Sequence, residues 1–175
     1  SEMCIRDSAC YGTTPNVRNT IVHELGHNLS LQHGGDASCN FKPNYNSVMN
    51  YRYQFSGIDS NCSLAGDGLV GYSVGTRPML NEEALDENAG ICGRAAGVPA
   101  DWNNNAELED GVAADINAND TNQSTACSGA LSPLTDFDDY SNLNLAAINS
   151  ALVRASVHRE VIDCQAVPEF AQQQP

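Results

Sequence analysis

One short stretch, from His23 to His33, constrains this chain more than any other. It reads HELGHNLSLQH, with histidines at 23, 27 and 33 and Glu24 beside the first of them. Residues i and i+4 share one face of an α-helix, so His23 and His27 can offer two imidazoles to one metal ion. His33 can join them only if the helix ends and the chain turns back. We therefore expect a helix over 14–30 followed by a sharp turn.

The expected helix has a clear start and an apolar face. Thr14 can cap it, and Pro15 suits the first helical position because its missing N–H has no partner there. Apolar residues follow at four-residue spacing, and we expect them to pack against the core. They are Val17, Ile21, Leu25 and Leu29.

Three histidine ligands leave one position open on a zinc ion. A water molecule in such a position has its pKa lowered to about 7. Glu24 is the base that we expect to take a proton from this water.

A second stretch, Asn46-Ser47-Val48-Met49-Asn50-Tyr51, follows soon after His33. The two stretches together resemble the metzincin superfamily of zinc endopeptidases, whose pattern HExxHxxGxxH is matched here except at its glycine. The resemblance implies that His23, His27 and His33 bind zinc. It also implies a Met-turn, in which Met49 lies beneath the histidines as an apolar floor, and a Tyr51 that approaches the zinc ion or the oxyanion.

The glycine of that pattern is replaced by Ser30. In the resembled family the glycine permits the turn that leads to the third ligand. We therefore expect Ser30 to adopt a left-handed conformation, at a cost of about 1 kcal/mol or more.

The resemblance implies an α+β fold of the metzincin-like zincin type. The chain starts at Ser1 without an initiator Met, and 22 residues precede His23. We therefore expect the C-terminal part of a catalytic domain, with a truncated or non-native lead-in over 1–13, the partial domain over 14–165 and a flexible tail over 166–175. Within the domain we expect a Met-turn over 46–51, loops over 66–75 and 90–99, a short helix over 81–87 and a C-terminal helix over about 136–162.

Two acidic, amide-rich runs between residues 101 and 123 resemble calcium loops. Their alternating oxygen-bearing side chains suit one hard cation, as in EF-hand or dockerin-type loops. Neither run has a glycine at its sixth position or a glutamate at its twelfth, so solvated Asn/Asp turns are the alternative. The residues are Asp101, Asn103 and Asn105 in the first run and Asp115, Asn117 and Asn119 in the second.

Composition limits the partners. The net charge of −14, from 22 acidic and 8 basic residues, argues against nucleic acid as a partner, and no apolar run is long enough to span a membrane.

The seven cysteines form no CxxC pair and indicate disulfides outside the cytosol, with one cysteine left over. Cys39 and Cys62 are the first expected pair, although spacing does not fix the disulfide connectivity. His158 has no second histidine nearby in the sequence and is expected to be a surface residue.

The function that these features favour is a secreted zinc endopeptidase acting on protein or peptide substrates. The main alternative is an extracellular, metal-stabilised binding or adhesion module with impaired catalysis, or an inactive fragment of such a protease. Ser30 favours that alternative, whereas Glu24 argues against it because a purely structural zinc site needs no base. A zinc hydrolase acting on another substrate class has no dedicated motif here.

Overall fold

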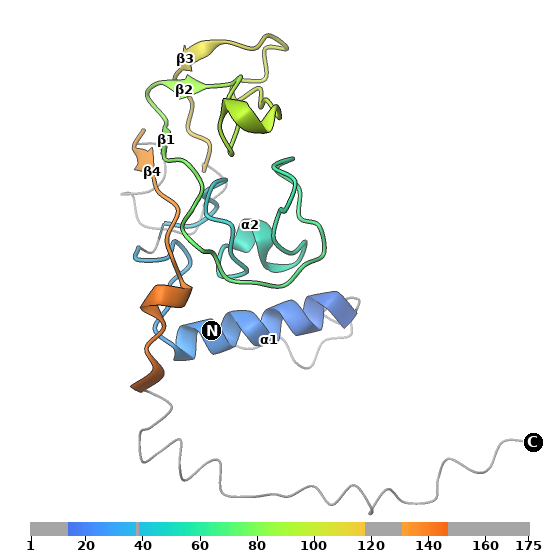
Figure 1. Ribbon diagram of the computed structural model, residues 1–175, viewed down its shortest axis with the longest axis vertical. Coiled ribbons are helices and arrows are strands. Elements are labelled where there is room, and N and C mark those ends of the chain that lie inside the picture. Colours follow the sequence, from blue (N-terminus) through green and yellow to red (C-terminus); the bar gives the residue numbers. More distant parts are fainter. Residues whose placement is uncertain (1–13, 38, 118–130, 147–175) are drawn as a thin grey trace, which may run out of the picture. The chain divides into compact units, whose positions relative to one another are not determined.

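The computed structural model describes residues 14–37, 39–117 and 131–146 of the chain (Figure 1). The chain divides into two units, residues 1–144 and 145–175, and every element named here belongs to the first. The mixture of helix and small antiparallel ladders agrees with the expected α+β class. Within the described ranges, no helix has the length and apolar character that a membrane span requires. The elements are α1 Thr14–Asn28, α2 Tyr51–Gln54, β1 Leu80–Asn81, β2 Leu85–Asp86, η2 Arg94–Ala96, β3 Asp110–Val112, β4 Pro133–Leu134 and η3 Tyr140–Asn142.

The ladders β1–β4 and β2–β3 are both antiparallel and pair residues far apart in the sequence. Leu80 lies opposite Leu134, and Leu85 lies opposite Val112. These four residues and Ile91 form one apolar cluster. A second cluster, of Leu31, Tyr45 and Met49, lies in the part of the unit that contains α1 and α2. Figure 1 shows the ladders at the end of this unit away from α1.

Helix α1 turns a mostly polar face toward the rest of the unit. Asn19, His23, Gly26 and Leu29 form this buried stripe. The predicted packing of the apolar stripe is wrong for all members except Leu29, because the other three side chains are 46–63% exposed. Those three are Val17, Ile21 and Leu25. Of the two helical histidines, His23 belongs to the buried stripe, whereas His27 is exposed.

The end of α1 is a Schellman motif centred on Ser30. The Leu31 N–H donates to the Gly26 carbonyl at 2.9 Å, and the Ser30 N–H donates to the His27 carbonyl at 3.0 Å. Ser30 has a φ of 74°, the left-handed conformation expected from the missing glycine. The helix therefore ends at Asn28, slightly before the predicted boundary, and the chain reverses toward His33.

Asparagine side chains organise the irregular segment 40–50. Asn40 Oδ1 accepts the N–H groups of Phe41 and Tyr51, and Asn50 Nδ2 donates to the carbonyls of Lys42 and Tyr45. Two further asparagines bind distant backbone in the same way: Asn44 donates to Pro78 and Leu134, and Asn46 exchanges two hydrogen bonds with Asp59. Backbone groups that a sheet would pair are thus bound by side-chain amides.

The predicted helix over 81–87 is wrong. Residues 80–81 and 85–86 are strands, and the Glu82 and Glu87 side chains are fully buried between them and neighbouring loops. Glu82 accepts N–H groups from Ile116 and Ser132. Glu87 accepts N–H groups from three residues, Trp102, Asn103 and Glu109. An exposed helix could not hold both carboxylates against these distant segments.

Two further predictions need correction. The predicted Cys39–Cys62 bridge is wrong, since Cys62 is bonded to Cys92 and Cys39 belongs to a different disulfide. The loop 90–99 contains the short η2, whereas residues 66–75 form a loop as predicted.

The predicted C-terminal helix does not begin at residue 136. Asp136 and Asp139 instead bind the loop around Ser73, whose hydroxyl donates to Asp136 and whose N–H donates to Asp139. Up to residue 146 the described chain forms only short 3-10 turns, among them η3. Residues 147–162 of that prediction lie outside the described residues, as do the segments 1–13 and 166–175 and His158.

Replacing Ser30 by glycine should stabilise the fold. Glycine adopts φ near 74° without the steric penalty of a Cβ atom, so Ser30→Gly should raise the free energy of unfolding by about 1 kcal/mol. Ser30→Ala is the matched control: it removes the hydroxyl but keeps the penalty, and should give no gain. Urea denaturation measures both, and equal stability of the two variants would contradict the assignment of strain to Ser30.

Candidate metal centre

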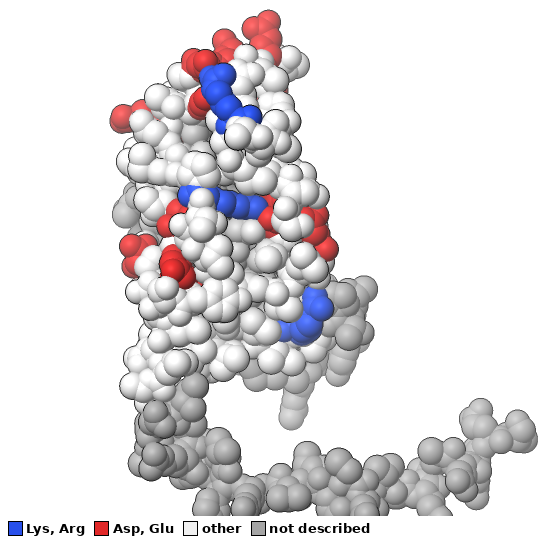
Figure 2. All heavy atoms as spheres, viewed as in Figure 1, with Lys and Arg blue, Asp and Glu red and all other residues white. Residues whose placement is uncertain are grey.

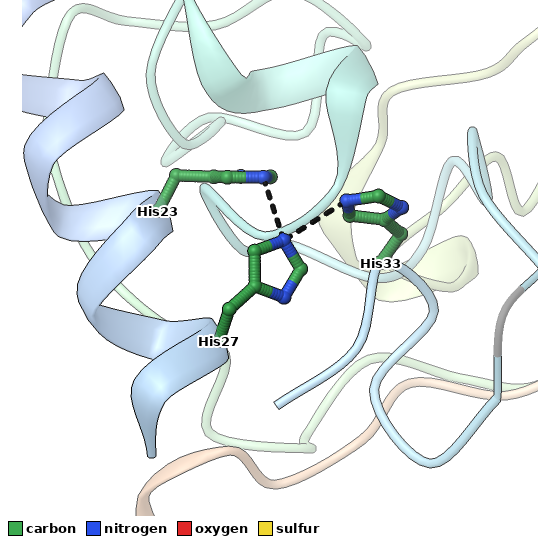
Figure 3. Close-up of side chains that lie close together, drawn as sticks. All are labelled: His23, His27 and His33. Atoms are coloured by element: carbon green, nitrogen blue, oxygen red, sulfur yellow. Dashed lines mark hydrogen bonds between the residues drawn. The ribbon is translucent and has the colours of Figure 1, made fainter. Parts of the chain in front are cut away.

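Three imidazole rings converge at the end of α1 (Figure 3). His27 Nε2 lies 3.1 Å from His23 Nε2 and 3.0 Å from His33 Nε2. One nitrogen from each ring lies within 4.8 Å of those of the other two. Two of the histidines come from successive turns of α1 and the third from the chain beyond the Schellman motif, as the sequence predicted. The structure thus brings all three predicted ligands together.

The outer nitrogens of two rings fix where their protons lie. His23 Nδ1 is 2.8 Å from the Val48 carbonyl, and His27 Nδ1 is 3.0 Å from the Leu31 carbonyl. A carbonyl oxygen can only accept, so both Nδ1 atoms carry hydrogen. In the neutral rings both Nε2 atoms therefore present lone pairs to each other. Such an arrangement is repulsive unless a cation lies between the nitrogens.

A metal ion satisfies this requirement better than a proton does. Burial lowers the pKa of His23, and nearby His27 lowers it further, against the Val48 hydrogen bond that raises it. Burial, followed by the charges of His27 and His23, lowers the pKa of His33 to about 4. Neutral imidazoles are the form that binds metal. A tetrahedral ion with nitrogen ligands at about 2.0–2.1 Å separates them by about 3.3–3.4 Å. The two separations that involve His27 Nε2, 3.1 and 3.0 Å, are close to this value.

A tight turn presents His33 to the other two rings. Gln32 and Gly35 exchange backbone hydrogen bonds on either side of it, and the Gly34 N–H donates to the Ala37 carbonyl. A Cβ atom on Gly34 would lie 2.1 Å from the Cys39 carbonyl oxygen. The turn is therefore closely packed against the backbone of Ala37 and Cys39, and Gly34 permits that packing.

Met49 lies under α1 at Gly26. It is fully buried, and its Sδ would be 2.2 Å from a Cβ atom added at Gly26. The neighbouring Val48 carbonyl holds His23, so one turn provides both the apolar support and a hydrogen-bond acceptor. The glycine within the HELGH motif is thus required by the approach of Met49.

Glu24 and Tyr51 flank the histidines. Glu24 is exposed on α1 next to His23. The Tyr51 ring is 42% exposed, and its centroid lies 4.3 Å from that of His33 and 5.5 Å from that of His23. The Asn40 side chain, which accepts the Tyr51 N–H, fixes the start of α2. The Tyr51 ring thus lies against two of the histidines, and Glu24 follows His23 directly on α1.

The first acidic run forms a compact turn around Asp101. Its Oδ1 accepts the Asn105 N–H at 3.2 Å, and its Oδ2 accepts the Ala106 N–H at 2.8 Å. Asn103 and Asn105 both donate from their amides to Glu109. Ala106 has a φ of 67°, so the position that lacks glycine still adopts the conformation that glycine would favour.

A second loop with the same conformation begins at Asp59 and was missed in the sequence. Asp59 accepts the N–H groups of Ser63 and Leu64, and Asn61 donates to Asp67. In both loops the fourth and sixth residues have positive φ: Cys62 and Leu64 in one, Asn104 and Ala106 in the other. The spacing Asp59-x-Asn61-x-Ser63 was the available signal.

Of the second predicted run, Asn117 is buried, Asp115 is half-buried and Asn119 lies outside the described residues.

Acidic side chains dominate the charge of the chain. Figure 2 shows them on the face that it draws, with few basic groups among them. Arg94 lies between Asp86 and Asp110 at N–O distances of 2.7 and 2.6 Å, so this cation is already paired.

Neither a protein-family model, nor a curated protein, nor a solved structure matches this chain. The site is therefore characterised by its own atoms: three histidines in positions that could hold a metal ion, with a carboxylate and a phenol beside them.

The lowered pKa of His33 predicts an acid-sensitive fold in the metal-free protein. Between about pH 4 and the ordinary histidine pKa of 6.5, the unfolded chain binds more protons at this residue than the folded chain. The free energy of unfolding should therefore fall as the pH is lowered through this range. Urea denaturation at several pH values would show a smaller slope for His33→Gln, and equal slopes would contradict the prediction.

Proposed function

We propose that this chain belongs to a secreted zinc endopeptidase of the metzincin type, acting on protein or peptide substrates. The observation that carries the proposal is the convergence of three Nε2 atoms beside an exposed glutamate on the same helix as two of them. The Met-turn and the left-handed Ser30 add support. The Cys62–Cys92 disulfide supports an oxidising, extracellular location.

In this proposal His23, His27 and His33 hold the zinc ion through their Nε2 atoms. Zinc bound there would lower the pKa of a water molecule bound to it and would polarise the scissile carbonyl. Glu24 accepts a proton from the attacking water and later delivers it to the leaving amine. Tyr51 donates a hydrogen bond to the oxyanion that develops on the substrate. Val48 and Leu31 keep two of the rings in the tautomer that binds metal.

Removing the carboxylate should separate metal binding from catalysis. In Glu24→Gln, zinc content measured by mass spectrometry should equal that of the unchanged protein, because the histidines are intact. Hydrolysis of casein should fall by about 10²–10⁴-fold through loss of the general base. Glu83→Gln, at an exposed glutamate elsewhere, is the control and should leave both quantities unchanged.

The outcomes distinguish the proposal from its alternative. Casein hydrolysis that stops with a zinc chelator and returns with added zinc supports the endopeptidase. A chain that binds one zinc ion but cleaves nothing supports the metal-stabilised binding module. Turnover retained in Glu24→Gln removes this residue from the mechanism.

We also propose that Ca²⁺ binds the loop that begins at Asp101. Its carboxylate, two amide oxygens and the Glu109 carboxylate lie within one short loop, and hard cations prefer such oxygen ligands. The matching conformation of the Asp59 loop indicates that this turn is a repeated unit rather than an accident of one segment. The alternative remains a solvated turn in which these groups bind only their own backbone.

Calcium should then raise the melting temperature of the zinc-loaded protein. At a hundredfold excess over its dissociation constant, a ligand specific for the folded state adds about 2.7 kcal/mol. Asp101→Asn should abolish the shift, and Mg²⁺ should produce a smaller one because it dehydrates reluctantly. Identical melting curves with and without Ca²⁺ would leave only the solvated turn.

A further inference from the structure

Lys42 is the only lysine in the chain, and it is almost completely buried. Its Nζ donates to the Gly34 carbonyl at 2.6 Å and to the Thr135 carbonyl at 3.0 Å. The same Nζ lies 5.3 Å from the centroid of the Tyr45 ring. One ammonium group thus binds two segments that are far apart in the sequence, one at Gly34 and one at Thr135.

The first of these bonds reaches the metal centre. Gly34 directly follows His33 in the turn closed by Gln32 and Gly35. His33 is also the ligand that α1 does not carry, so its position depends on how this turn is held. The Lys42 hydrogen bond and the close packing of Gly34 both hold this turn.

The backbone of Lys42 extends the connection to the other side of the site. Its carbonyl accepts a hydrogen bond from Asn50 Nδ2 at 2.7 Å. Asn50 caps α2, the helix that begins with Tyr51, and the Tyr51 ring lies against His33. The Lys42 side chain therefore binds the turn that carries His33, and its backbone carbonyl binds Asn50, the residue before Tyr51.

Stability alone does not explain a buried ammonium here. Removing a charged group from water costs several kcal/mol, and Nζ is bound here by neutral carbonyls. Asp36, Asp136 and Asp139 offset part of that cost by raising the lysine pKa, although burial lowers it more. An apolar side chain of similar length would avoid this cost but would remove the donor that binds the Gly34 and Thr135 carbonyls.

We infer that Lys42 is a positioning residue that sets His33 in place for the metal ion. The inference rests on the proposed metal site, although not on peptide hydrolysis. Outer residues that orient a metal ligand typically affect affinity by about 10–100-fold. Loss of the Nζ–Gly34 bond frees the 32–35 turn and moves His33 away from the lone pairs of His23 and His27.

The test is Co²⁺ binding by Lys42→Met, which keeps the side-chain length and removes both donated bonds. Co²⁺ affinity should fall by about 10–100-fold, and the visible absorption of the bound ion should change as its ligand geometry changes. Lys42→Arg retains N–H donors and should recover part of the affinity.

Asn44→Ala is the matched control. Asn44 is also buried and donates two hydrogen bonds to carbonyls, one of them to Leu134, the residue before Thr135. Both of its acceptors, Pro78 and Leu134, lie outside the His33 turn, so its loss should lower the melting temperature while the Co²⁺ spectrum and affinity remain unchanged.

A double-mutant cycle with His33→Gln separates positioning from general destabilisation. If Lys42 acts through His33, Lys42→Met should have little further effect on Co²⁺ affinity once His33 is absent. An equal effect in both backgrounds, or wild-type affinity and spectrum in Lys42→Met, would overturn the inference. If the unchanged protein binds no Co²⁺, the metal site itself fails, a result distinct from failure of Lys42 alone. If Lys42→Met does not fold, the same comparisons are made with Lys42→Gln, whose shorter side chain withdraws the donor from the Gly34 carbonyl. Wild-type Co²⁺ binding in that variant, together with a lowered melting temperature, would also overturn the inference.

Discussion

Side-chain amides hold together the part of the chain that surrounds the candidate metal centre. Between residues 40 and 50 there is no strand, yet the side chains of Asn40, Asn46 and Asn50 each bind backbone groups. An amide offers both a donor and an acceptor on a short stem, so it can replace the hydrogen bonds of a ladder at a single point. The position of Met49 and the start of α2 both depend on these bonds.

Two contacts of its buried face accompany the unusual orientation of α1. A helix normally buries its apolar stripe, but here the buried face consists of Asn19, His23 and Gly26, with Leu29 at its end. His23 must reach the Val48 carbonyl, and Gly26 must admit the Met49 sulfur. These two contacts belong to the buried face of the helix, while Val17, Ile21 and Leu25 on another face are exposed.

The sequence predicted those features that are set by local chemistry. The helix with two histidines follows from the i, i+4 spacing, whereas the reversal at Ser30 was expected from the resembled motif pattern. The structure contains both, together with the approach of His33. The prediction was wrong where distant partners decide. Glu82 and Glu87 read as helix-forming acids, but N–H groups from segments far along the chain bind them. Cysteine spacing likewise could not identify Cys92 as the partner of Cys62.

The matching loops at Asp59 and Asp101 bear on the order in which the chain can fold. Each carboxylate binds N–H groups only four and five residues ahead, so each loop closes over a short stretch at small entropic cost. Contacts of this kind form before pairings between remote segments. Cys62 lies inside the first loop, so its sulfur is held in a defined place before it meets Cys92, 30 residues away. A locally encoded turn can in this way direct a covalent bond that sequence spacing does not specify.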